Sequence, residues 1–168
     1  MLVRDVRGNA ITASGATPVA LLDQAVDAYL GFRKDTGERL KAALAAEPGS
    51  VLGQCLRGYF MMLFGQRAMV SRAQRSLEAA QAARRAADIT GREAAHVAAL
   101  AAWVAGDFGG ATVRWESITA DHPCDVLALK LAQCGRAGAG CARPSSQGQS
   151  VHNRPAARGP GHNPTDRR

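Results

Sequence analysis

The chain has 168 residues, 46% hydrophobic and 5% aromatic, which suits one domain with a single core. Its many alanines and few β-branched residues exclude an all-β fold, no apolar run approaches the roughly 20 residues of a membrane span, and the charged opening is unlike a signal peptide. We therefore expect a cytoplasmic protein with no membrane partner, and its net charge of +7 lies mainly in residues 134–168, which carry +5.

The first two expected helices form a hairpin. Thr17 and Pro18 are a helix-start signal, a hydroxyl cap followed by proline at the first helical position. The apolar residues that follow at helical spacing are Leu22, Val26, Tyr29 and Phe32. Asp35 and Glu38 have the spacing of a capping box, which predicts a second helix over residues 36–47.

The next two expected helices differ in how much of their surface is apolar. Residues 51–64 are apolar over more than half of the helix circumference, so this segment should be the most buried helix. Residues 67–88 form a longer helix with one apolar face. The other face carries four arginines, Arg72, Arg75, Arg84 and Arg85. We interpret it as a solvated surface and not a phosphate site, because the opposite face must be buried.

A second capping box opens the fifth expected helix. Thr90 and Glu93 have the capping spacing, and the alanine-rich residues 92–105 follow. Alanine along one side lets neighbouring backbones approach closely. The sequence GDF at 106–108 then ends the helix as a turn.

The last two expected helices are shorter. Ala111, Trp115 and Ile118 mark the inward face of a sixth helix, which ends before Pro123. A final apolar stretch begins at Val126 and is expected to last barely two turns before Gly135.

The expected hairpins repeat at a regular interval. Their starts lie near residues 18, 51, 92 and 125, with spacings of 33, 41 and 33 residues. A repeat of roughly 34 residues built from two antiparallel helices is the tetratricopeptide signature, in which each hairpin is buried only against its neighbours. We therefore predict an all-α fold, an antiparallel helix-hairpin solenoid of tetratricopeptide type.

The third hairpin resembles a tetratricopeptide repeat at individual positions. Ala99 is the close-packed small residue, and Gly106 and Asp107 belong to the inter-helix turn. Ala111 is the small residue opposite, Trp115 is the aromatic residue of the second helix, and Pro123 is the final proline. The pattern is broken where Ala95, Ala98 and Ala102 replace the usual large side chains. The first two hairpins match by pattern and length alone.

More narrowly, residues 10–133 resemble the tetratricopeptide repeat protein 38 family. The stretches that carry this resemblance are TASGATPVALLDQAVDAYLGF, LKAALAAEPG, GYFMMLFGQRAMV, TGREAAHVAALAAWVAGDF and HPCDVLALKLAQ. The resemblance implies an α-helical solenoid that mediates protein interactions, with no activity to carry over. It covers the N-terminal third of such proteins, which continue with further hairpins.

The sequence changes character after Gln133. From Cys134 it becomes a mixture of Arg, Gly, Ala, Pro and Ser with few large apolar residues, so we expect residues 134–168 to be a disordered basic tail. The abrupt change favours a truncated or frameshifted reading frame over a genuine tail, and sequencing the gene locus distinguishes the two. The expected domains are an N-terminal extension, residues 1–16, a repeat domain of about three hairpins plus a partial helix, residues 17–133, and the tail.

Three residues of the fifth helix are candidates for a ligand-binding groove. Glu93, His96 and Trp103 occupy positions that commonly face the concave groove of a tetratricopeptide array. The alternative is structural, an exposed capping Glu and a partly packed His, because no second ligand follows at metal or acid–base spacing. The four cysteines lack a CxxC pair, which favours reduced, mostly buried thiols over a zinc site or disulfides. We expect no catalytic residue, metal or cofactor.

The functional hypothesis is a non-catalytic protein-interaction module of tetratricopeptide type, with an unidentified protein or peptide as its partner. Two alternatives stay open: a nucleic-acid-associated protein that binds weakly and nonspecifically through its tail, and the remnant of a longer enzyme. The last helix has no partner helix in this scheme. We therefore also expect self-association through the uncapped C-terminal repeat, residues 111–132, which charged replacements at Leu127 and Leu131 should reduce.

Overall fold

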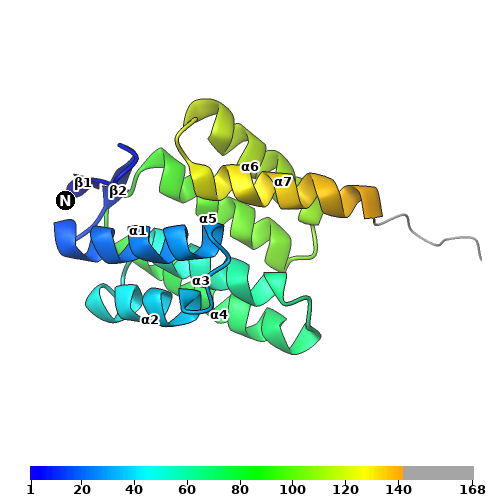
Figure 1. The fold of residues 1–168 in the computed structure, drawn as a ribbon, viewed down its shortest axis with the longest axis horizontal. Coiled ribbons are helices and arrows are strands. Elements are labelled where there is room, and N and C mark those ends of the chain that lie inside the picture. Colours follow the sequence, from blue (N-terminus) through cyan, green and yellow to red (C-terminus); the bar gives the residue numbers. More distant parts are fainter. Residues whose placement is uncertain (142–168) are drawn as a thin grey trace, which may run out of the picture.

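Helices dominate the computed structural model, which describes residues 1–141 (Figure 1). In chain order the elements are β1 (Leu2–Arg4), β2 (Ala10–Thr12), α1 (Ala16–Leu30), α2 (Thr36–Ala46), α3 (Val51–Leu63), α4 (Arg67–Ala86), α5 (Gly91–Val104), α6 (Phe108–Asp121) and α7 (Val126–Cys141). The mainly helical fold confirms the coarse prediction. Most of the expected tail, residues 142–168, lies outside the described residues. No helix within residues 1–141 has both the length and the hydrophobicity needed to cross a bilayer.

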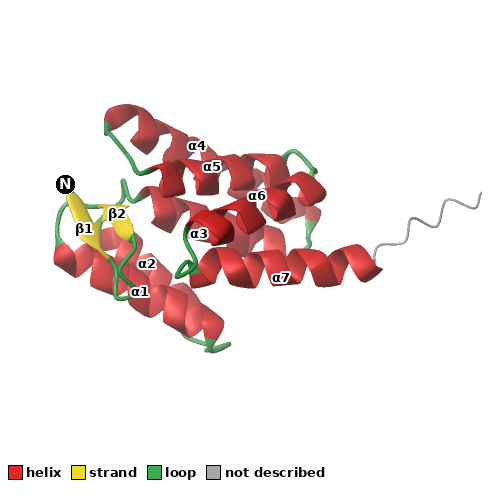
Figure 2. Cartoon of the chain, turned by 90° about the horizontal axis from the view of Figure 1, so that it is seen from above, coloured by secondary structure: helices red, strands yellow, loops and turns green. Residues whose placement is uncertain are grey.

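Successive helices pack in pairs, as the hairpin prediction requires. The pairs are α1 with α2, α3 with α4 and α5 with α6, and α7 lies against α6 (Figure 2). Helix α5 also packs on α3 and α4, while α1 contacts α7. The contact between the first and the last helix makes this part of the chain more closed than an array in which each unit touches only its neighbours.

Helix α3 lies at the centre of the core, which confirms that its segment is the most buried. Leu56 and Tyr59 of α3 are 0% exposed, as are Leu100 of α5 and Trp115 of α6. Helices α3 and α5 approach closely at Gly58. A Cβ atom there would lie 2.6 Å from Leu100 Cδ2, so only glycine fits without moving Leu100.

The N-terminal segment forms a β-hairpin, which the sequence analysis did not predict. Strands β1 and β2 pair antiparallel, with Val3 opposite Ile11, and the turn places Gly8 at a φ of +84°. The Asp5 carboxylate accepts hydrogen bonds from the backbone N–H groups of Arg7 and Asn9, which fixes the turn. Ile11 is only 2% exposed, so the hairpin contributes to the core.

Two of the three expected helix caps differ from the prediction. Helix α1 begins one residue before Thr17, with Gly15 at the N-cap and no side-chain cap. Asp35 is at the N-cap of α2, but its carboxylate accepts hydrogen bonds from the Arg33 and Arg39 side chains and not from a helix N–H. Two arginine partners outcompete the backbone there, and they lower the Asp35 pKa to about 2. The capping box of Thr90 and Glu93 is confirmed at α5.

Helix α7 is longer than expected and is covered by its neighbours. It continues through Gly135 to Cys141 and so crosses the expected domain boundary at 133. Gly135 does not end the helix; it lets α7 approach α6, where a Cβ atom would overlap the side chain of Thr112. Leu127 and Leu131 are 3% and 1% exposed. They therefore form no open apolar face, and the expected route to self-association is wrong at these two positions.

Candidate functional site

A buried polar cluster joins α3, α5 and the start of α7, and we call it the buried tetrad: Tyr59, Arg92, His96 and Asp125. Asp125 accepts from Arg92 Nη1 at 2.8 Å, and its Oδ2 lies 3.0 Å from His96 Nε2. The Tyr59 hydroxyl donates to the His96 carbonyl at 2.8 Å and lies 3.1 Å from His96 Nδ1. All four side chains are at most 4% exposed. Such a chain of contacts resembles an acid–base relay in its composition.

The electrostatics of the tetrad favour a charged Asp125 and a neutral Tyr59. Burial raises the pKa of Asp125, but the His96 hydrogen bond, the Ala128 N–H and Arg92 outweigh burial and hold that pKa below its ordinary value. Burial raises the pKa of Tyr59 well above its ordinary value, so its phenol stays neutral. The Asp125 carboxylate also caps α7 through the Ala128 N–H at 2.9 Å. These roles stabilise the fold.

The tetrad has no room for a substrate. The cavity beside Arg92 and Asp125 has a volume of about 20 Å³, which accommodates a water molecule and nothing larger. The β-hairpin closes this side, since Arg92 Nη2 donates to the Ala10 carbonyl at 3.2 Å and lies 3.9 Å from an Asp5 oxygen. A bound molecule could reach Arg92 and Asp125 only if the β-hairpin moved away from α5.

Glu93, the neighbour of Arg92 in the first turn of α5, also holds the β-hairpin in place. Its carboxylate accepts from the Thr12 hydroxyl at 2.9 Å and from the Thr12 N–H at 3.2 Å. The same carboxylate accepts from the Thr90 N–H and hydroxyl, which completes the capping box. Glu93 and His96 are both 0% exposed. Neither residue faces an open groove, and Glu93 is not the exposed cap of the alternative interpretation either.

Trp103, the third groove candidate, belongs to an aromatic cluster. Its ring centroid lies 5.1 Å from that of Phe108, 5.3 Å from that of Trp115 and 6.2 Å from that of Tyr59. It is half-buried, so part of its ring remains accessible. The structure brings Glu93 and His96 into the polar interior and leaves Trp103 apart from them at the far end of α5.

The positions that resemble a tetratricopeptide repeat have packing and turn roles. The three core members, Ala99, Ala111 and Trp115, are each 0% exposed. Gly106 adopts a φ of +88° in the turn, and the Asp107 carboxylate caps α6 by accepting from the Gly110 N–H at 2.7 Å. Pro123 follows the end of α6, as expected.

The three cysteines whose side chains the structure describes differ in exposure. Cys55 is buried, and burial raises the pKa of its thiol; Cys124 is exposed and Cys134 is half-buried. The expectation of mostly buried thiols therefore fits Cys55 and not Cys124. Within residues 1–141, no cluster of three or more His, Cys, Asp or Glu side chains is placed to hold a metal ion.

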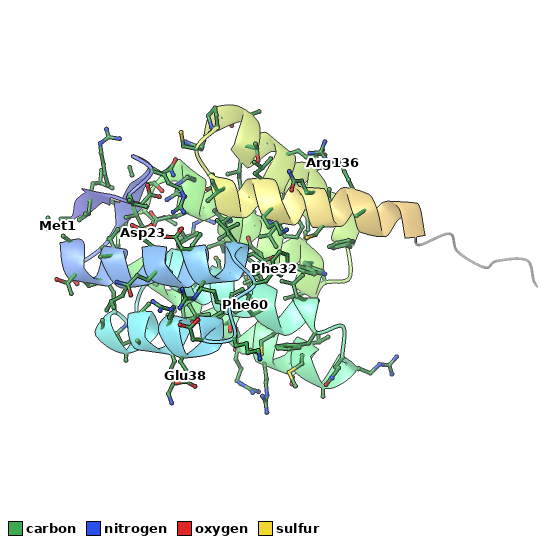
Figure 3. All side chains as sticks on the ribbon, in the orientation of Figure 1. Met1, Asp23, Phe32, Glu38, Phe60 and Arg136 are labelled. Atoms are coloured by element: carbon green, nitrogen blue, oxygen red, sulfur yellow. The ribbon has the colours of Figure 1, made fainter. Side chains whose placement is uncertain are left out.

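An open apolar hollow lies at the ends of α1 and α3, and we call it the outer hollow. Its volume is about 590 Å³, and its apolar lining consists of Tyr29, Phe32, Phe60, Met61, Leu63 and Phe64. Figure 3 shows Phe32 and Phe60 at this corner, beyond the end of α1. Phe32 and Phe64 are 79% and 64% exposed. The helical spacing predicts Phe32 on the apolar stripe of the first helix, which is wrong.

Phe32 departs from the prediction because the helix ends before it. It adopts a φ of +53°, a left-handed conformation that is costly for a bulky residue. Its ring faces solvent and is covered in part by Lys130, whose Nζ lies 4.7 Å from the ring centroid. The sequence signal for this turn is Gly31, which ends α1 one residue earlier.

A second hollow, of about 240 Å³, adjoins the outer hollow through Met61, which lines both. We call it the arginine hollow, since Arg57, Arg72 and Arg75 line it together with Ser76. Arg57 Nε donates to the Ser76 hydroxyl at 3.0 Å. The sequence pattern predicts Arg72 and Arg75 on a solvated face but gives no signal for Arg57, because α3 is apolar around most of its surface.

No protein-family model matches this chain, and no solved structure matches it.

Proposed function

We propose that this chain is a non-catalytic protein-interaction module of tetratricopeptide type that binds a partner protein through the outer hollow. The observation that carries the proposal is a concave apolar surface on which Phe32 and Phe64 are more than half exposed. Large accessible aromatic side chains around a hollow are typical of contact sites between proteins. The paired helices and the buried small residues Ala99 and Ala111 support the tetratricopeptide part of the proposal.

We place the partner contact at the outer hollow and not at the groove candidates Glu93 and His96 of α5. Glu93 and His96 are buried, and the β-hairpin covers Arg92 and Glu93. A peptide would have to displace strand β2 to reach them. The outer hollow needs no such rearrangement.

Site-specific photocrosslinking tests the proposal. A photoreactive phenylalanine analogue replaces Phe64 in the outer hollow or, as the matched control, Val113 on α6, which is equally exposed at 64%. We expect position 64 alone to crosslink to a particular protein, and the purified protein to form a complex with the chain. Replacing Phe32 with serine in the same chain should abolish both.

Two results would contradict the proposal. Equal crosslinking at positions 64 and 113, or a purified partner that binds the Phe32→Ser chain as well as the parent, would remove the outer hollow as the contact site. Circular dichroism of each variant serves as the folding control, since Phe32 and Phe64 are exposed and their replacement should leave helix content unchanged.

A further inference from the structure

The outer hollow and the arginine hollow are neighbours that share the lining residue Met61. The apolar half around Phe60 and Phe64 lies on one side of Met61, and the basic half around Arg72 and Arg75 lies on the other. Lys34 adds a further cation on the rim of the apolar half. A ligand that spans both halves must present apolar and negative groups side by side.

The cations of the basic half lack acidic partners within the described part of the chain. No ion pair there involves Arg57, Arg72 or Arg75. The one acid of α4, Glu78, accepts a hydrogen bond from Gln74. Around the apolar half, Asp35 is already engaged by Arg33 and Arg39. The surface therefore carries positive charge that the fold itself does not neutralise.

We propose that the two neighbouring hollows together are a docking site for an acidic amphipathic segment of the partner protein, with large apolar side chains in the outer hollow and carboxylates against Arg72 and Arg75. The inference rests on the proposed function and specifies the chemistry of its partner. Complementary charge would steer the segment to the surface, and the hollow would hold its apolar side chains.

Other occupants fit less well. Residues 134–168 of the same chain carry a net charge of +5, so their sign matches that of the surface. A second copy would bring the same basic patch against itself in a symmetric pair. A lipid surface would take up the exposed Phe32 and Phe64 but would leave the concave part of the hollow, lined by Tyr29, Phe60 and Met61, unfilled.

Fluorescence anisotropy with defined probes tests the inference on the full chain. The first probe is a synthetic amphipathic peptide with leucine and phenylalanine on one face and glutamate on the other. The second probe carries lysine in place of each glutamate. Vesicles of phosphatidylcholine, with or without phosphatidylglycerol, form a third arm. We expect binding of the acidic peptide only, with an affinity that falls as salt is raised.

Two charge-reversed variants on the same helix locate the contact. The double variant Arg72→Glu/Arg75→Glu changes the basic half, and Arg84→Glu/Arg85→Glu makes the same change at exposed positions outside both hollows. We expect the first to weaken binding of the acidic peptide by about tenfold or more and the second to leave it nearly unchanged. Phe64→Ser should weaken binding to a similar degree.

The outcomes separate this inference from the proposed function. Equal binding of the acidic and basic peptides, equal losses in the two double variants, or binding to anionic vesicles alone would overturn the acidic-segment assignment. If the position-specific crosslinks at Phe64 persist in that case, the protein-interaction function stands and its partner has another chemistry. If the crosslinks are also absent, the function fails together with the inference.

Discussion

The His96 ring and the Asp125 carboxylate lie 3.0 Å apart in the interior, although 29 residues separate them in the chain. One belongs to the middle of α5 and the other precedes α7. With Arg92 on the same oxygen, this contact fastens the last helix to the rest of the domain. Its removal should therefore affect the whole fold and not one helix end.

Replacing Asp125 with alanine should lower the free energy of unfolding by about 3–5 kcal/mol, because it leaves Arg92 buried without its closest acid. Urea denaturation followed by circular dichroism measures the change. Asp121→Ala removes the same charge at an exposed position near the end of α6 and should cost little. Similar losses of unfolding free energy in the two variants would show that the buried contacts of Asp125 do not stabilise the fold more than an exposed carboxylate does.

Stability should fall in acid partly through Asp125. Its pKa is lower in the folded chain than the ordinary value of 3.8, so its contribution is full above that value and is lost as pH falls towards the folded pKa. We expect the free energy of unfolding to drop between about pH 5 and pH 2, and Asp125→Asn to flatten this drop. Asp35→Asn is the comparison. Its pKa is also lowered, to about 2, but solvent screens its pairs with Arg33 and Arg39, so its effect should be smaller.

Gly58→Ala should destabilise the chain by about 1–3 kcal/mol, because the added Cβ would lie 2.6 Å from a buried Leu100 side chain. Gly37→Ala makes the same change inside α2, where nothing lies within 4 Å of the added atom. That variant should be more stable than the parent by about 0.5–1 kcal/mol. Thermal melts of both variants give opposite shifts if α3 and α5 are packed as described.

Trp103→Ala distinguishes the two interpretations of this residue. A groove residue would lose partner binding while helix content and melting temperature stay constant. The rings of Phe108 and Trp115 lie against Trp103, so we expect a lower melting temperature, with a cost of about 3 kcal/mol. Val113→Ala, at an exposed site, is the control. An unchanged melting temperature for Trp103→Ala would restore the groove interpretation.

The helices could be predicted from the sequence because their signals are local. The 3.6-residue periodicity placed all seven, and the Thr90 and Glu93 spacing located the start of α5 correctly. The errors arise where a local signal competes with a distant partner. Asp35 was predicted to cap α2 but binds Arg33 and Arg39, and Gly135 was predicted to end α7 but packs on Thr112.

The β-hairpin and the buried tetrad could not be predicted in this way. Strands of three residues are too short for a periodic pattern, and the hydrogen bonds that fix β2 come from Arg92 and Glu93. The sequence of α5 itself offers His96 no partner at metal or acid–base spacing. Its partners, Tyr59 and Asp125, lie 37 and 29 residues away, so the role of His96 follows from the fold alone.

The position of the β-hairpin has a consequence for how the chain folds during synthesis. Thr12 leaves the ribosome well before its partner Glu93, which follows 81 residues later. The contacts of the hairpin with α5 therefore form only after two helix pairs, α1–α2 and α3–α4, and the first turn of α5 have emerged. Repeat arrays ordinarily fold by local propagation from one unit to the next. Here long-range contacts between the two ends should slow folding and make it a single cooperative step.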